Sequence, residues 1–231
     1  MASEKNNEPE QTVVDNLNSH LTSAGEKVAG NKKIIFWGVG AVCVVAAFVL
    51  SYLFIYKNPR LENSWNAYDK VQLMVQKGEL ASDTVAAQEY AKVADNYSST
   101  QAGEMAALSA AEAFYNVKKY DDAIKYLEKC DIDEPVLNTQ AKVLLGDCYV
   151  NKKQYDKAID AFQSAIKKAA GNPELVPLIL IKEANVYDAQ KKYDKALDCY
   201  TQIKQNFPSF SFDNGLSIDA YIERENARLG K

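Results

Sequence analysis

The sequence predicts an all-α protein in which a solenoid of stacked helical hairpins follows a single apolar helix. The first observation is a seven-residue phrase that occurs three times, with 35 and 38 residues between successive starts. A period of about 34 residues is typical of paired helices that stack side by side. The second observation is an uncharged run of 23 residues, 34–56, which as a helix is long enough to cross a membrane. The three phrases are Lys118–Ile124, Lys153–Ile159 and Lys191–Leu197.

Residues around each phrase also recur at fixed distances. Counted from the alanine of the phrase, a small residue stands twelve positions before it, an aromatic residue nine positions before it, and a large residue four positions after it. Small side chains let the two helices of a hairpin approach closely, while aromatic rings fill the space beside them. A proline follows each hairpin and is expected to stop its second helix. The alanines are Ala123, Ala158 and Ala196, the small residues Ala111, Gly146 and Ala184, the aromatic residues Phe114, Tyr149 and Tyr187, the large residues Leu127, Phe162 and Tyr200, and the prolines Pro135, Pro173 and Pro208.

These residues make the three segments resemble the tetratricopeptide (TPR) family. The resemblance implies a solenoid whose concave surface, lined mainly by the first helix of each repeat, binds protein partners. Asparagine amides there could bond the backbone of an extended peptide and a tyrosine could pack its side chains, although the same residues could simply form a solvated polar face. Acidic residues stand where TPR domains that capture a chain-terminal carboxylate have lysines. Transferring the TPR positions residue by residue places Glu112, Tyr115, Asn116, Asp147, Asn151, Asn185 and Asp188 on that surface.

The chain divides by composition into four parts. Residues 1–33 form a polar arm with an apolar stripe that predicts a short amphipathic helix, which either lies on the membrane or docks on a membrane partner. The apolar helix follows at 34–56. A solenoid with one degenerate and three clear repeats is expected at 57–208, and residues 209–231 should supply a helix that covers its last apolar face. The amphipathic helix spans Thr12–Ala29, the degenerate repeat pairs Glu62–Lys77 with Thr84–Tyr97, the clear repeats span about 102–130, 136–169 and 175–207, and the capping helix spans Leu216–Leu229.

We interpret residues 34–56 as a membrane anchor rather than a cleaved signal peptide, because a 33-residue arm precedes the run and no small-x-small cleavage site follows it. Trp37 lies near one end and Tyr52 and Tyr56 near the other, as suits the two membrane interfaces. Basic residues on the two flanks nearly balance, and the doublet at 32–33 favours a cytoplasmic N-terminus. Small residues on one face could admit a second membrane helix, although such residues are common in membrane helices anyway. These residues are Gly40, Cys43, Ala47 and Ser51.

The sequence argues against an enzyme. The single histidine, His20, lies in the arm, and the repeats carry no phosphate-binding glycine loop, nucleophile elbow or metal motif. We therefore expect no cofactor, no metal and no small-molecule substrate. The net charge of −4 is spread over two mildly acidic parts, which gives no reason to expect nucleic acid as a partner. Cys130, Cys148 and Cys199 are expected to pack in the core, with a disulfide between Cys130 and Cys148 as the alternative.

The anchor and the TPR array together resemble the YfgM-type ancillary subunits of the bacterial Sec translocon. The resemblance implies a cytoplasmic N-terminus, a single inner-membrane span and a periplasmic TPR domain. It also implies association with the translocon and a membrane-anchored chaperone, and assistance to exported polypeptides. Two alternatives stay open: a scaffold subunit of another envelope assembly or secretion machine, and an organelle-membrane receptor whose repeats face the cytosol. The missing groove lysines and the small number of repeats weigh against the receptor.

Overall fold

The computed structural model describes residues 32–211 and 217–231, which are helical apart from turns and short connections and contain no strand. The chain divides between Pro59 and Arg60 into two compact units. The predicted all-α fold with TPR-like hairpins is confirmed. The arm before residue 32, including the amphipathic helix expected at Thr12–Ala29, lies outside the described residues.

The first unit contains the apolar helix. Helix α2 (Lys32–Ser51) passes into a π-helical turn, η1 (Tyr52–Lys57), in which the rings of Tyr52 and Tyr56 stack with 5.6 Å between their centroids. Among the described residues, one helical stretch, Phe36–Gln76, is long and apolar enough to cross a membrane. None of its most apolar window is buried, whereas the core helix of a globular domain is mostly buried.

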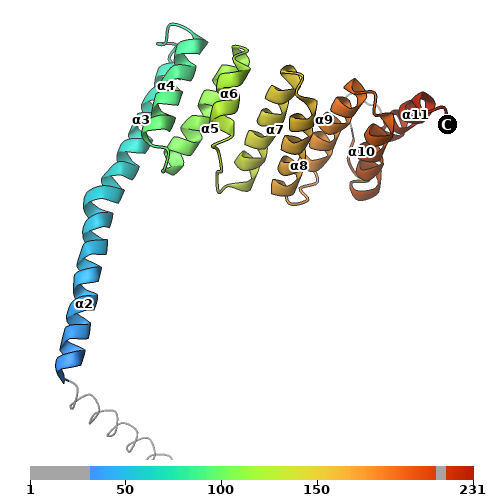
Figure 1. Cartoon of the computed structure of the whole chain (residues 1–231). Helices are drawn as coiled ribbons and strands as arrows, with labels where there is room; N and C mark the ends of the chain where they lie inside the picture. Colours follow the sequence, from blue (N-terminus) through green and yellow to red (C-terminus); the bar gives the residue numbers. More distant parts are fainter. Residues whose placement is uncertain (1–31, 212–216) are drawn as a thin grey trace, which may run out of the picture. The chain divides into compact units, whose positions relative to one another are not determined.

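The second unit is a row of antiparallel hairpins (Figure 1). Each helix from α4 onward packs against the next one along the chain, up to α11. Contacts between sequence neighbours are what define a solenoid. The helices are α3 (Asn58–Gln76), α4 (Asp83–Asn96), α5 (Gln101–Asn116), α6 (Tyr120–Leu127), α7 (Pro135–Asn151), α8 (Tyr155–Lys168), α9 (Leu175–Ala189), α10 (Tyr193–Asn206) and α11 (Ile218–Arg228).

The residues that recur in the sequence form the core of this row. The phrase alanines Ala123, Ala158 and Ala196 have no exposed surface. In the middle repeat the small and large residues face each other directly, because a Cβ atom placed on Gly146 would lie 2.6 Å from Cδ1 of Phe162. Steric overlap at that distance leaves room only for glycine. The recurrence therefore specifies where the two helices of a hairpin touch.

The degenerate first hairpin is held by tyrosines rather than by the consensus residues. Tyr68 on α3 places its ring 5.9 Å from that of Tyr90 on α4, and its hydroxyl shares a 3.2 Å hydrogen bond with Oγ of Ser109 on α5. Helices α4 and α5 approach closely where Gly103 lies against the carbonyl group of Tyr97, since a Cβ atom on Gly103 would overlap that group. These contacts join the first hairpin to the regular repeats.

A turn of one geometry ends the first helix of each regular repeat. Lys118, Lys153 and Lys191, the first residues of the three phrases, adopt left-handed backbone conformations with φ of 62°, 57° and 60°. The next residue donates its N–H to the carbonyl group of the recurring aromatic residue, at 2.9 Å in all three repeats. This is the Schellman helix ending, which usually has glycine at the left-handed position. The repeated phrase thus encodes a helix stop as well as a helix start.

Pro135 corrects one expectation from the sequence. Helix α6 ends at Leu127, well before this proline, and Pro135 instead begins α7. Proline is tolerated there because the first amides of a helix have no intrahelical partner. The side chain of Glu134 accepts hydrogen bonds from the amides of the next two residues after the proline, at 3.1 and 2.6 Å. Pro208, in contrast, follows the end of α10 as expected.

Candidate protein-binding groove

Two adjoining pockets form a groove along the first helices of the hairpins. The larger, of about 520 Å³, is lined by residues of α5, α7 and α9. The smaller, of about 410 Å³, is lined by residues of α3, α4, α5 and α7. Glu112 and Gln140 line both pockets, so the two form one continuous surface, which we call the groove.

The larger pocket has an apolar floor and a charged rim. Leu178 is its most accessible apolar side chain, with 51 % of its surface exposed. The rim carries Glu112, Asp147 and Lys182, and the surrounding protein removes enough water from the Glu112 carboxyl group to raise its pKa. Such a surface matches an amphipathic peptide better than a small polar molecule. The floor residues are Val143, Leu144, Leu175, Leu178 and Ile179.

The smaller pocket is aromatic and polar. Tyr68 and Tyr90 contribute their rings, while Gln72, Gln140 and Asn116 contribute amides. Amides can donate to and accept from the backbone of an extended peptide, and tyrosine rings can pack against its side chains. The groove therefore changes in character along its length, from aliphatic on α7 and α9 to aromatic near α3.

The structure separates the seven residues expected on the concave surface into two groups. Glu112, Asn116 and Asp147 line the groove. The other four lie on the same helices but do not line either pocket; they are Tyr115, Asn151, Asn185 and Asp188. A role in binding stays a prediction for all seven.

Several of these side chains form hydrogen bonds or ion pairs with residues of the neighbouring repeat. Asn151 donates from Nδ2 to the hydroxyl group of Tyr115 at 3.3 Å. Lys182 reaches both carboxylate oxygens of Asp147 at 2.9 Å. These bonds link residues 35 or 36 positions apart, which places corresponding turns of neighbouring first helices side by side. Part of the expected binding surface thus aligns the repeats.

Lys182 adds a basic side chain to the groove beside the expected acids Glu112 and Asp147. Its side chain is 42 % exposed and lies on the rim of the larger pocket. Sequence reasoning missed it, together with the apolar floor. One signal could have indicated the floor: residues 175–181 are uninterrupted apolar residues, too many for one buried helix face.

The last hairpin is closed by an ionic cluster on α11. Arg224 donates to Asp188 Oδ2 at 3.0 Å and to Glu225 Oε1 at 2.6 Å, and Arg228 lies within 3.1 Å of both carboxylates. Glu225 has no exposed surface; burial opposes its ionisation, but hydrogen bonds from Arg224 and Asp188 outweigh this and lower its pKa. Burial, together with the hydrogen bond to Glu225, raises the pKa of Asp188. The cluster fixes α11 to α9.

The cysteines of the repeats, the remaining candidates for chemistry in the sequence, lie in the core. Cys130, Cys148 and Cys199 are buried, unbonded thiols, and burial raises their pKa values to about 11, about 12 and about 12. A protonated buried thiol behaves as a small apolar side chain. Within residues 32–211 and 217–231, three or more histidine, cysteine or acidic residues nowhere gather in a way that could hold a metal ion.

Among the residues that the structure describes, nothing covers the small-residue face of the apolar helix. Gly40, Cys43, Ala47 and Ser51 are exposed, and a Cβ atom placed on Gly40 would have nothing within 4 Å. Contact with a second membrane helix stays a prediction.

Family models of the tetratricopeptide repeat match residues 114–179 and 180–209, from the last turn of α5 to the residues after α10. Residues 114–209 therefore form tetratricopeptide repeats. It is 23 % identical over 205 residues to a protein of Neisseria gonorrhoeae (strain ATCC 700825 / FA 1090) named as an ancillary SecYEG translocon subunit, covering 87 % of this chain and 90 % of that relative. The repeat family and this relative indicate a non-enzymatic scaffold with a protein-interaction role.

Solved structures with similar hairpins support the fold alone. A crystal structure of MamA protein superposes with a TM-score of 0.53 at 22 % identity, covering 74 % of this chain and 83 % of MamA. A Podosopora anserina kinesin light chain with nearly identical TPR-like repeats gives a TM-score of 0.52 at 13 % identity, covering 74 % and 87 % of the two chains.

Proposed function

We propose that this TPR protein is an ancillary subunit of a bacterial protein translocon, held in the inner membrane by residues 34–56, whose periplasmic repeats bind exported polypeptides and associate with the translocon and a membrane-anchored chaperone. The observation that carries the proposal is the groove with its exposed apolar floor, in a chain that also has a candidate membrane span. The similarity to an ancillary translocon subunit supports it, because that similarity extends over most of both chains.

The groove suits a transient client. An unfolded polypeptide offers alternating apolar and polar side chains, which can bury against Leu178 and its neighbours while their backbone bonds to the rim. Burying the exposed part of one leucine stabilises a complex by about 1–2 kcal/mol, so several such contacts give reversible binding rather than permanent assembly.

Affinity purification of the full chain in mild detergent, followed by mass spectrometry, tests this function. Leu178→Asp places a charge on the groove floor and should reduce recovery of polypeptide clients. Leu73→Asp is a matched control, because Leu73 on α3 is 49 % exposed and does not line the groove. Recovery of a single unrelated envelope machine, unchanged by Leu178→Asp, would instead support the scaffold alternative.

Topology has its own experiment. Protease added to intact spheroplasts should digest residues 58–231, because the repeats are proposed to face the periplasm. The lysine doublet at 32–33 supports this orientation. Full protection of the repeats would reverse the orientation and remove exported polypeptides as clients.

A further inference from the structure

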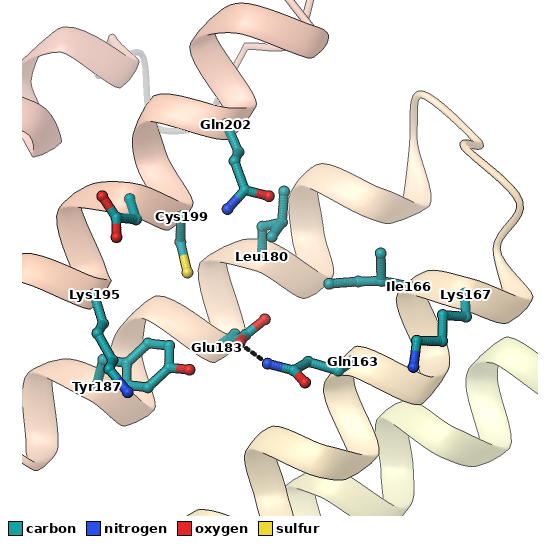
Figure 2. Close-up of a pocket in the computed structure, with 10 residues that line it drawn as sticks. Gln163, Ile166, Lys167, Leu180, Glu183, Tyr187, Lys195, Cys199 and Gln202 are labelled. Atoms are coloured by element: carbon teal, nitrogen blue, oxygen red, sulfur yellow. Dashed lines mark hydrogen bonds between the residues drawn. The ribbon is translucent and has the colours of Figure 1, made fainter.

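A separate pocket of about 410 Å³ lies between α8, α9 and α10 (Figure 2). It shares no lining residue with the groove. Its floor comes from α9, through Leu180, Glu183 and Tyr187, and its walls come from the second helices of two successive repeats. Because second helices form its sides, the pocket opens on a different face from the groove, which the first helices line.

The unusual residue in this pocket is Glu183. It is a carboxylic acid with only 5 % of its surface exposed, and it immediately precedes the small residue Ala184. The residues in that place in the other two regular repeats are Ala110 and Leu145, both apolar and buried. Packing of the repeat therefore does not call for an acid here.

Neutral hydrogen-bond donors compensate the acid, namely the Gln163 amide and the Tyr187 hydroxyl group. Gln163 on α8 donates from Nε2 to Oε1 of Glu183 at 3.0 Å, as the dashed line in Figure 2 shows. None of the ion pairs found in residues 32–211 and 217–231 involves Glu183. A buried carboxylate is costly unless a cation or several donors neutralise it. Lys167, Lys195 and Asp198 also line the pocket, but Glu183 itself has no ion-pair partner among the described residues.

The residues around Glu183 suit the stem and head of a cationic side chain. Leu180 and Ile166 offer apolar surface for an aliphatic stem. The Tyr187 ring already forms a cation–π contact, since Nζ of Lys195 lies 5.5 Å from the centroid of the ring. Burial first, and then the charge of Glu183 nearby, raise the pKa of the Tyr187 hydroxyl to about 12, so this group stays protonated and neutral beside the carboxylate.

We propose that this pocket binds a cationic side chain, an arginine guanidinium or a lysine ammonium group, from a partner protein, and that Glu183 forms the ion pair with it. The carboxylate supplies the charge, Gln163 holds it in place, and the aliphatic wall accepts the stem of the incoming residue. The site shares no residue with the groove. It would give the repeats a second binding site for a partner, one that relies on an ion pair rather than on apolar contacts.

The test uses the full chain in detergent and three probes: N-acetyl-arginine amide, N-acetyl-lysine amide and the neutral isostere N-acetyl-citrulline amide. Calorimetric titration should show that a cationic probe binds at least about tenfold more tightly than citrulline. Glu183→Gln should remove this preference, because the amide keeps the size of the side chain and can still accept from Gln163 but carries no charge. The matched control is Lys195→Gln, which removes a like charge at the rim and should leave cation binding intact or strengthen it.

Measurements on the wild-type chain alone keep the proposal falsifiable if a variant does not fold. Equal affinity of wild-type protein for the cationic and neutral probes, or no binding of any probe, would overturn it. A preference for cations that survives in Glu183→Gln would also overturn it, because the ion pair would then lie elsewhere.

Discussion

Gly146 on α7 packs directly against the ring of Phe162 on α8. The ring lies so close that residue 146 has room for no side chain larger than the hydrogen atom of glycine. Phe162 is itself almost completely buried, so the ring has no free space to move into. This contact sets the distance between the two helices of the central repeat.

Gly146→Ala should therefore destabilise the repeats although alanine is the better helix former. Overlap with the ring costs about 1–3 kcal/mol, which exceeds the gain of about 0.5–1 kcal/mol in helix propensity. Urea unfolding of the full chain in detergent measures the loss. Adding Phe162→Leu should restore part of it, and Gly38→Ala is a control, because nothing lies within 4 Å of a Cβ atom there. A variant as stable as the parent would contradict the packing.

Lys153→Gly should stabilise the protein by about 0.5–1 kcal/mol, because glycine adopts the left-handed conformation without steric cost. Lys153 has a φ of 57° and ends α7 in a Schellman turn. Thermal unfolding followed by circular dichroism measures the change. Lys167→Gly, inside the last turn of α8, should instead destabilise the protein, because glycine is a poor helix former. Destabilisation by both substitutions would show that the turn gains nothing from glycine.

Alkaline solution should unfold the repeats. Burial raises the pKa values of Tyr149, Tyr187 and Tyr200 to about 12, above their ordinary value of 10.0, and the three buried thiols shift in the same direction from 9.0. A folded pKa above the unfolded one means that the fold binds the proton more tightly, so this stability is complete below about pH 9 and is lost progressively as the pH rises toward about 12.

Urea unfolding at several alkaline pH values tests this linkage, with tyrosinate absorbance reporting ionisation. The midpoint should fall as pH rises, and tyrosinate should appear together with loss of helix. A midpoint that stays constant from about pH 8 to about pH 11 would show that these groups ionise equally in both states.

Arg224→Ala should loosen the C-terminal helix. It removes hydrogen bonds to Asp188, Glu225 and the hydroxyl group of Tyr200, and it leaves Arg228 as the remaining cation beside the buried Glu225 carboxylate. Leaving a buried charged group short of partners costs about 1–3 kcal/mol. Hydrogen exchange of α11 should accelerate. Lys204→Ala is the control, because its ion pair with Asp219 is more than half exposed on both sides and should contribute at most about 0.5 kcal/mol.

The sequence predicted the hairpins well because the contacts inside a repeat are local. The spacing between Gly146, Ala158 and Phe162 is short enough to see as a pattern, and the structure packs Gly146 against Phe162 and buries Ala158 completely. The first hairpin was harder, since Tyr68 and Tyr90 replace the consensus residues there with a tyrosine pair that no regular spacing reveals.

The groove was predicted only in part because its chemistry depends on contacts between repeats. Asp147 looked like a free acid in the sequence, but its partner, Lys182, lies one repeat away and on the same side. Asp188 likewise belongs to the cluster with Arg224 and does not line the groove. Pairings of this kind need the offset between first helices, which the sequence alone does not give.

Helix α6 has only eight residues, against fourteen in α8 and in α10. In a linear array of hairpins, each hairpin is held to the next only by the surface that the two bury against each other. A short helix buries the least surface. A chain tethered at one end and pulled by a bound polypeptide carries the load through every boundary in series. We therefore expect such tension to part the array first between α6 and α7, leaving the hairpins on either side folded.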